Sequence, residues 1–232
     1  RGHQRPVGAA AIRGTLKPRS RALRGFLFTR KGPTMADLDY LDDQRAAELA
    51  RLIKDGAIFI RPEGATPPTG LSWKPGEDAG SVGYYGDEGF ELAAAAGDST
   101  DLTGHNGDVL VSDQAPGWWT VKFSGLEGRA RITAAYFDVD EKDIGADGAV
   151  TVNSAANNKR YDIVTVGLDQ KGRAALIHYP SVQISEKDSI VFNRTTLMAM
   201  GLTFRTFKGG SAAPYHFRAW GLIIDDTGED DG

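Results

Sequence analysis

Short apolar runs separated by turn residues are the feature that most constrains the fold of this chain of 232 residues. The 29 glycines and 10 prolines together occupy 39 positions. Because these two residues interrupt helices and form tight turns, they disfavour a helical bundle and favour a chain of short strands. Several runs alternate apolar and polar side chains with a period of two, which is typical of strands that are buried on one face only.

The second half of the chain has the clearest strand signals. Residues 198–205 alternate Met, Leu and Phe with small or polar residues, which predicts a half-buried strand. Residues 159–168 and 173–185 are expected to form a hairpin around a turn at residues 170–172. Other strands are expected at residues 57–60, 81–92, 108–112, 119–123, 149–152 and 215–224.

Two helices are expected beside these strands. Apolar residues at helical spacing predict one over residues 37–54, with a stop at Gly56, and another over residues 126–137. Residues 61–80 hold four prolines and are expected to form a long loop, a kind of segment that is commonly functional or disordered. The predicted fold is mainly β: an antiparallel β-sandwich or barrel with one packed helix, an N-terminal helix and a long loop.

Charge divides the chain into parts of different character. Residues 1–34 carry nine Lys or Arg and no acid, which leaves 18 basic against 31 acidic residues in the rest, a net charge of −13. Three interpretations of this basic leader compete: a nucleic-acid-binding arm, a transit peptide, and translated upstream sequence. The third arises because the codons for residues 31–32 contain a ribosome-binding core at a productive distance from Met35. We expect one β domain over residues 35–224, followed by a disordered acidic tail at 225–232.

Residues for catalysis, metal binding or a cofactor do not form a recognisable set. There is no Cys, the four His lack metal-ligand spacing, and no nucleophile or phosphate-binding motif occurs. In the acidic run at residues 138–143, Lys142 takes a ligand position of a calcium loop and Asp143 takes the position that needs Gly, so a solvated turn is favoured. We therefore expect neither an enzyme nor a cofactor. No apolar run approaches the roughly 20 residues of a membrane span.

The tryptophans leave an alternative function open. Trp118 and Trp119 follow a Pro-Gly turn at the start of a strand, so one is expected to face the core and the other the surface. Trp73 lies in the predicted long loop. Exposed aromatic rings stack on sugars or on protein partners, so a carbohydrate-binding β-sandwich or adhesin is the alternative interpretation.

Several short motifs follow one another in a distinctive order between residues 57 and 224. They are AIFIRPEG at 57–64, LSW at 71–73, GSVGY at 80–84, STDLTGHNGD at 99–108, VKFSGLE at 121–127, RYDIV at 160–164 and ALIHYPSVQIS at 175–185. In this order they resemble the major tail proteins, or tail tube proteins, of long non-contractile-tailed phages, particularly those of actinobacterial hosts.

This resemblance implies a structural role in the virion. Such proteins are β-sandwiches with a flanking helix; six copies form a ring, and rings stack into a tube around a tape-measure protein. The tube is assembled in the host cytoplasm, meets tail terminator and distal tail proteins, and conducts genomic DNA without binding it specifically. The long loop joins adjacent rings in this family, and residues 61–80 match it by position. The tube of a contractile tail or of a related secretion system stays open as an alternative.

The residues themselves are compatible with such an assembly. A β protein can satisfy open strand edges by continuing its sheets into neighbouring copies, and a net charge of −13 would repel DNA phosphate. The sequence does not assign the residues that face the lumen. We expect contacts between copies at Trp73, Tyr84, Tyr85, Trp118, Asp138 and Asp140.

Overall fold

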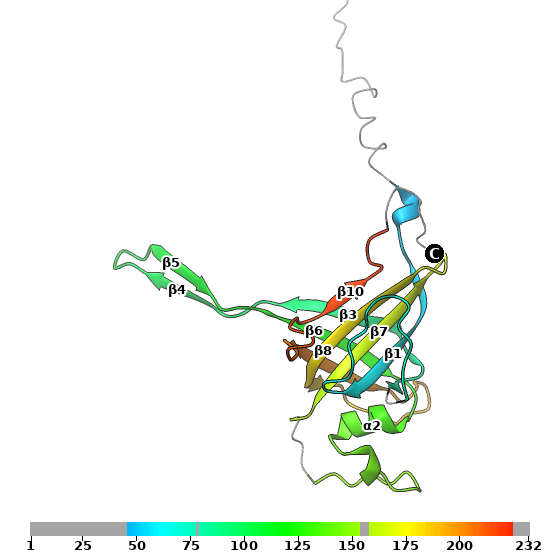
Figure 1. Cartoon of the computed structure of the whole chain (residues 1–232). Coiled ribbons are helices and arrows are strands. Elements are labelled where there is room, and N and C mark those ends of the chain that lie inside the picture. The colour runs from blue at the N-terminus through cyan, green and yellow to red at the C-terminus, as the bar shows by residue number, and fades with distance from the viewer. Residues whose placement is uncertain (1–45, 78, 154–157, 225–232) are drawn as a thin grey trace, which may run out of the picture. The chain divides into compact units, whose positions relative to one another are not determined.

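The computed structural model describes residues 46–77, 79–153 and 158–224 (Figure 1). The chain divides into two units after Ala46, and the fold described here is that of the second unit. Its strands are β1 (Ile53–Pro62), β2 (Gly80–Ser81), β3 (Tyr85–Ala95), β4 (Ser99–Thr103), β5 (Val109–Gln114), β6 (Trp118–Gly125), β7 (Arg160–Asp169), β8 (Ala174–Lys187), β9 (Met200–Phe207) and β10 (Arg218–Trp220). Its helical elements are α2 (Ala130–Phe137) and the short 3-10 turns η2 (Ala47–Leu49) and η3 (Glu141–Asp143).

Eight of the strands form one antiparallel sheet in the order β2-β1-β7-β8-β9-β6-β3, with β10 paired to β8. The long strand β8 has two partners on one of its edges: residues 176–178 pair with β10, and residues 181–187 pair with β9. The other two strands, β4 and β5, pair only with each other. The mainly β, antiparallel fold with one packed helix confirms the predicted class.

The hydrophobic core is formed by buried side chains of the main sheet together with those of helix α2. Phe123 and Phe204 stack at 5.4 Å between ring centres, and both are buried. Helix α2 buries Ile132 against this core, which stabilises the fold by roughly 1.5–3 kcal/mol. The helix can approach because Gly125 has no side chain: a Cβ there would collide with Ile132. The buried apolar residues also include Ile58, Ile60, Val121, Ile163, Tyr179, Val182 and Leu202.

The prediction of a helix over residues 37–54 is wrong for the residues that the structure describes. Residues 37–45 lie outside the described residues, and the rest of the predicted helix, residues 46–54, forms only the turn η2 before β1 begins at Ile53. The backbone here bonds to a distant side chain, since Leu52 N donates to Gln170 Oε1 at 2.7 Å and Gln170 Nε2 donates to Ala50 O at 2.8 Å. These tertiary hydrogen bonds take the place of helical ones.

Other boundaries also differ from the sequence-based expectation. Helix α2 begins at Ala130 rather than at residue 126, and the last strand is limited to Arg218–Trp220. The prediction of a strand at residues 149–152 is wrong, because these residues form no strand. Gly145 N donates to Ala149 O at 2.9 Å in a turn, and Val152 is 46% exposed. An apolar run without a neighbouring strand forms no ladder. The predicted disordered tail, residues 225–232, lies outside the described residues.

The predicted long loop is present, but it begins two residues later, after Pro62, and ends at β2. It packs against the sheet, because Arg61 donates through one terminal nitrogen to Thr66 O at 3.0 Å and the Trp73 ring meets Phe59 edge-on at 5.5 Å. Within the described ranges, no helix has the length and hydropathy needed to cross a membrane.

Candidate functional site

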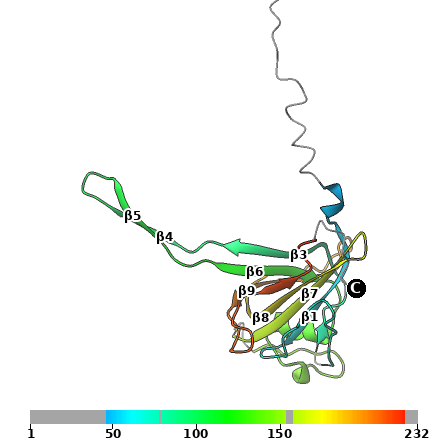
Figure 2. The ribbon, with the colours of Figure 1, turned by 45° about the horizontal axis from the view of Figure 1, so that its top comes forward.

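A two-stranded ribbon, β4 with β5, is the most exposed element of the described chain. Every residue of both strands is exposed to solvent. In both views the ribbon projects beyond the end of the β3–β6 pair and away from the rest of the sheet (Figures 1 and 2). We call residues 96–117, which contain this ribbon, the arm.

The base of the arm depends on two glycines. The pairing of β3 with β6 ends at Ala95 and Trp118. Beyond this pair the two backbone segments approach each other very closely. A Cβ on Gly97 would collide with the carbonyl oxygen of Ala115, and a Cβ on Gly117 would collide with the carbonyl oxygen of Ala95. Glycine is therefore required where the backbones pass from the sheet into the arm.

The two faces of the arm differ in polarity. On one face Leu102 lies opposite Val111, and these side chains are 59% and 53% exposed. The register then shifts before the pair of Thr103 with Val109, and Val109 and Leu110 at this irregularity are also exposed. On the other face Asp101 lies opposite Ser112, whose hydroxyl donates to the carboxylate at 2.6 Å. A two-stranded ribbon is marginally stable by itself, and here its apolar face has no second layer within the described residues. Such a face is a candidate contact surface.

The arm is also strongly acidic. It contains four aspartates and no Lys or Arg: Asp98, Asp101, Asp108 and Asp113. Asp113 lies on the apolar face, because it is two residues from Val111 on the same strand and opposite Thr100. Its carboxylate makes no side-chain hydrogen bond or ion pair with a described residue. The arm thus presents a free negative charge next to exposed apolar side chains.

Cations and aromatic rings gather on the outward faces of β6, β7 and β9, beside the base of the arm. The Cζ atom of Arg205 lies 4.1 Å from the centre of the Trp118 ring and 5.5 Å from that of Phe207. The Cζ atom of Arg160 lies 4.3 Å from the centre of the same Phe207 ring. We call these four residues the Arg205 stack. The register of the sheet builds it, because Arg205 pairs with Thr120, two residues after Trp118.

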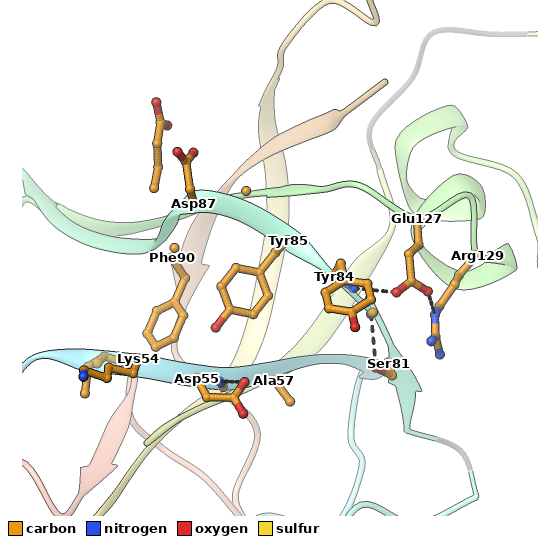
Figure 3. Close-up of a pocket in the computed structure, with 16 residues that line it drawn as sticks. Lys54, Asp55, Ala57, Ser81, Tyr84, Tyr85, Asp87, Phe90, Glu127 and Arg129 are labelled. Carbon is orange, nitrogen blue, oxygen red and sulfur yellow. Dashed lines mark hydrogen bonds and ion pairs between the residues drawn. The ribbon is translucent and has the colours of Figure 1, made fainter. Parts of the chain in front are cut away.

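The two ends of the main sheet face one another across a cleft of about 790 Å³ (Figure 3). β1 pairs with β2 only at Phe59 and Ile60, and β3 pairs with β6 alone among the described strands. Residues 53–57 of β1 therefore lie opposite β3 without a ladder between them. The rings of Tyr85 and Phe90 point from β3 into this cleft, which we call the seam (Figure 3).

Two residues that line the seam, Glu127 and Tyr85, have pKa values shifted from their usual ones. Glu127 accepts hydrogen bonds from Tyr84 N at 2.8 Å and from Arg129 Nε at 2.5 Å, and these bonds, the backbone one first, lower the pKa of its carboxyl. Burial, with Asp55 nearby, raises the pKa of Tyr85. At neutral pH Glu127 is thus ionised and Tyr85 is a neutral phenol. Two unpaired strand edges give the seam the properties of an assembly surface.

A buried polar network lies at the opposite end of β1. Asp162 binds Arg61 through Oδ1 and His178 Nε2 through Oδ2, at 2.6–2.8 Å. His178 Nδ1 lies 3.0 Å from the hydroxyl oxygen of Tyr215. Both ring nitrogens of this histidine are therefore engaged. Ser181, the nearest serine along β8, donates instead to Glu63 at 2.7 Å. The network holds strands and loops together, and no free base faces a nucleophile in it.

The six residues predicted to contact other copies lie in different parts of the fold. Tyr84 and Tyr85 come together at the seam, where Tyr84 is 78% exposed. Trp73 packs on the sheet, in the long loop, and Trp118 belongs to the Arg205 stack. Their roles in assembly stay predictions.

The remaining two of these residues, Asp138 and Asp140, line a separate cleft of about 360 Å³. Asp138 ends helix α2 in the left-handed conformation, with φ of 57°. Lys159, which hydrogen-bonds Asp140 at 2.9 Å, lowers the pKa of that carboxyl. No group of three His, Cys, Asp or Glu within the described ranges is arranged to hold a metal ion.

The arm is the feature that sequence reasoning missed. A signal was present: residues 99–103 include two Thr and one Leu, a turn with two glycines follows at residues 104–107, and the next run contains Val109, Leu110 and Val111. The Arg205 stack had no such signal, because its members come from three strands whose register only the folded sheet defines.

The chain has little measurable similarity to known proteins. No family model matches it, and no curated protein matches it. Among solved structures it is similar to a cryo-EM structure of the anti-feeding prophage cap, the AFP tube terminating cap, with a TM-score of 0.35 and 10% identity over 77% of this chain and 95% of that chain. A likeness of this size carries no argument about function.

Proposed function

We propose that this chain is a structural protein of a phage tail, in which six copies form a ring and rings stack into the tail tube. One observation carries the proposal: an amphipathic, acidic arm projects from the sheet with its apolar face uncovered. A ribbon of this kind gains stability when a second copy covers Leu102 and Val111, since burying each of these side chains contributes roughly 1.5–3 kcal/mol before the cost of association.

The seam supplies a second type of contact. Residues 53–57 of β1 and the outer edge of β3 each offer backbone groups to an incoming strand. Lateral pairing through such edges joins copies within a ring, while the arm joins copies that lie further apart. Two independent kinds of surface on one chain are what a closed ring that also stacks requires.

The expected charge of the tube fits passage of DNA without retention. Residues 35–232 carry a net charge of −13, so a lumen lined with part of this charge repels phosphate. In this function the protein resides in the virion after assembly in the host cytoplasm. Its further partners are a tape-measure protein inside the tube and the terminator and distal proteins at the two ends.

The decisive experiment is negative-stain imaging and sedimentation of the purified full chain over a range of concentrations. Rings or tubes are expected, and they should be lost when residues 98–114 are replaced by a two-residue turn. A wild-type chain that remains monomeric at high concentration, with the circular dichroism of a folded β protein, would contradict the proposal.

A matched pair of substitutions separates the apolar face from general effects on the arm. Val111 lies on the apolar face, opposite Leu102, so Val111→Ser should weaken assembly. Gln114→Ser changes an exposed residue on the other face, opposite Ser99, so it should assemble like the wild type. Equal effects of the two changes would indicate that the apolar face makes no specific contact.

A further inference from the structure

We propose that the arm of one copy docks on the Arg205 stack of a second copy, with the carboxylate of Asp113 bound to the guanidinium of Arg205. This inference rests on the proposed self-assembly and names the receiving surface. An acidic ribbon with an apolar face and a surface of aromatic and guanidinium groups are complementary in both charge and polarity.

Arg205 is prepared for such a contact. Its guanidinium lies over the rings of Trp118 and Phe207, so the side chain is held in place although the residue is exposed. Stacking uses the flat faces of the group and leaves the N–H donors at its edge for an acceptor. No carboxylate among the described residues pairs with Arg205.

Two other cations on these strands have carboxylate partners. Lys122 Nζ lies 3.4 Å from Asp188, and a terminal nitrogen of Arg160 lies 3.9 Å from Glu63. Of the two cations in the stack, Arg205 is therefore the one without a carboxylate partner among the described residues. Because the guanidinium is held in place before binding, less side-chain entropy is lost when the contact forms.

Of the two aspartates in the paired strands β4 and β5, Asp113 is the one on the apolar face of the arm. It lies on the apolar face with Leu102 and Val111. Asp101 lies on the other face and accepts a hydrogen bond from Ser112, and Asp108 at the tip accepts one from Asn106. A surface that covers the apolar face of the arm therefore meets Asp113 and not Asp101.

The arm of the same chain cannot make this contact. Asp113 precedes Thr120, the residue paired with Arg205, by seven positions in a nearly extended chain, which is roughly 23 Å at about 3.3 Å per residue. The arm also runs away from β9 in both views (Figures 1 and 2). The occupant is therefore a second copy.

The test is a charge exchange in the full chain, followed by sedimentation velocity and negative-stain imaging. Arg205→Asp and Asp113→Arg should each raise the apparent dissociation constant of assembly by at least about tenfold, because each places like charges together. The double variant, Arg205→Asp with Asp113→Arg, should recover assembly. Asp101→Arg, on the polar face, is the control and should assemble like the wild type. Circular dichroism verifies that each variant is folded.

The outcomes separate this inference from the proposed function. If the wild type assembles and the arm deletion does not, but Arg205→Asp assembles normally, the arm does not dock on the Arg205 stack. The proposed function as a tube protein is unaffected by that result. If both single variants fail and the double variant does not recover, the pairing of these two residues is wrong. A monomeric wild type overturns both. A fluorescent single-stranded 30-mer of dT that binds the wild type but not Arg205→Asp, with assembly unchanged, would make the stack a nucleic-acid site and overturn the inference.

Discussion

His178 Nε2 lies 2.8 Å from Oδ2 of Asp162, and neither side chain is accessible to solvent. The other oxygen of the same carboxylate accepts two N–H groups of Arg61, at 2.8 and 2.6 Å. Arg61, Asp162 and His178 come from β1, β7 and β8, three strands that neighbour one another in the sheet. The carboxylate of Asp162 thus connects β1, β7 and β8 at the end of the sheet where the long loop begins.

Removing this carboxylate should be severely destabilising. Asp162→Ala leaves the buried guanidinium of Arg61 without its counterion, and loss of one partner of a buried pair costs about 3–5 kcal/mol. The free energy of unfolding, measured by urea titration with circular dichroism, should fall by this amount. Asp113→Ala removes an exposed, unpaired carboxylate and should stay within about 0.5 kcal/mol of the wild type. A loss below about 1 kcal/mol for Asp162→Ala would show that the network adds little.

Stability should fall in acid because of Asp169. Burial acts to raise the pKa of this carboxyl, but hydrogen bonds from the backbone and side chain of Arg173 and from Lys171 N outweigh it, so the pKa lies well below its usual value. A group with a lowered folded-state pKa stabilises the fold above its unfolded value, near pH 4, and loses this contribution as the pH falls further. Asp169→Asn should therefore have a lower Tm than the wild type at pH 6, and the difference should shrink towards pH 2. A Tm difference in differential scanning calorimetry that is constant from pH 6 to pH 2 would exclude this role.

The turn between β7 and β8 should not tolerate a side chain at Gly172. Its φ is +77°, a conformation that costs an L residue roughly 1–2 kcal/mol, although nothing lies within 4 Å of the added Cβ. Gly172→Ala should lower the free energy of unfolding by that amount. The control is Gly70→Ala, which has equal space and no positive φ and should be neutral or slightly stabilising. Equal effects of both changes in thermal unfolding would rule out backbone strain as the cause.

The hydroxyl of Tyr161 should be dispensable. It is buried without a hydrogen-bond partner in the described chain, and burial, with Asp138 nearby, raises its pKa. Tyr161→Phe removes an unsatisfied polar group and keeps the ring contact with Phe204 at 6.3 Å, so the free energy of unfolding should rise by up to about 1 kcal/mol. Tyr161→Ala, which also removes the ring, should lose about 3–5 kcal/mol. Guanidinium titration distinguishes the two; a loss of stability in the Phe variant would reveal a partner for the hydroxyl.

Strand patterns in the sequence were reliable for the strands that are most buried in the sheet. The hairpin of β7 and β8 and the strand β9 were predicted because their apolar residues alternate or run continuously between clear turn residues. Helix α2 was predicted from the spacing of its alanines and Phe137. The run at residues 149–152 has the same composition as a strand but is not one, because composition does not reveal whether a neighbour is available for hydrogen bonding.

The sequence by itself determined the class of the fold, through turn residues at short intervals and apolar side chains at a period of two, since both act locally along the chain. It also determined the acidic balance beyond residue 34. Only the tertiary structure decided that Ala50–Leu52 bonds to Gln170 instead of continuing a helix, that the sheet stays open at the seam, and that Arg205 lies over Trp118. Each of these depends on strand register and on contacts between residues far apart in the chain, which local patterns do not specify.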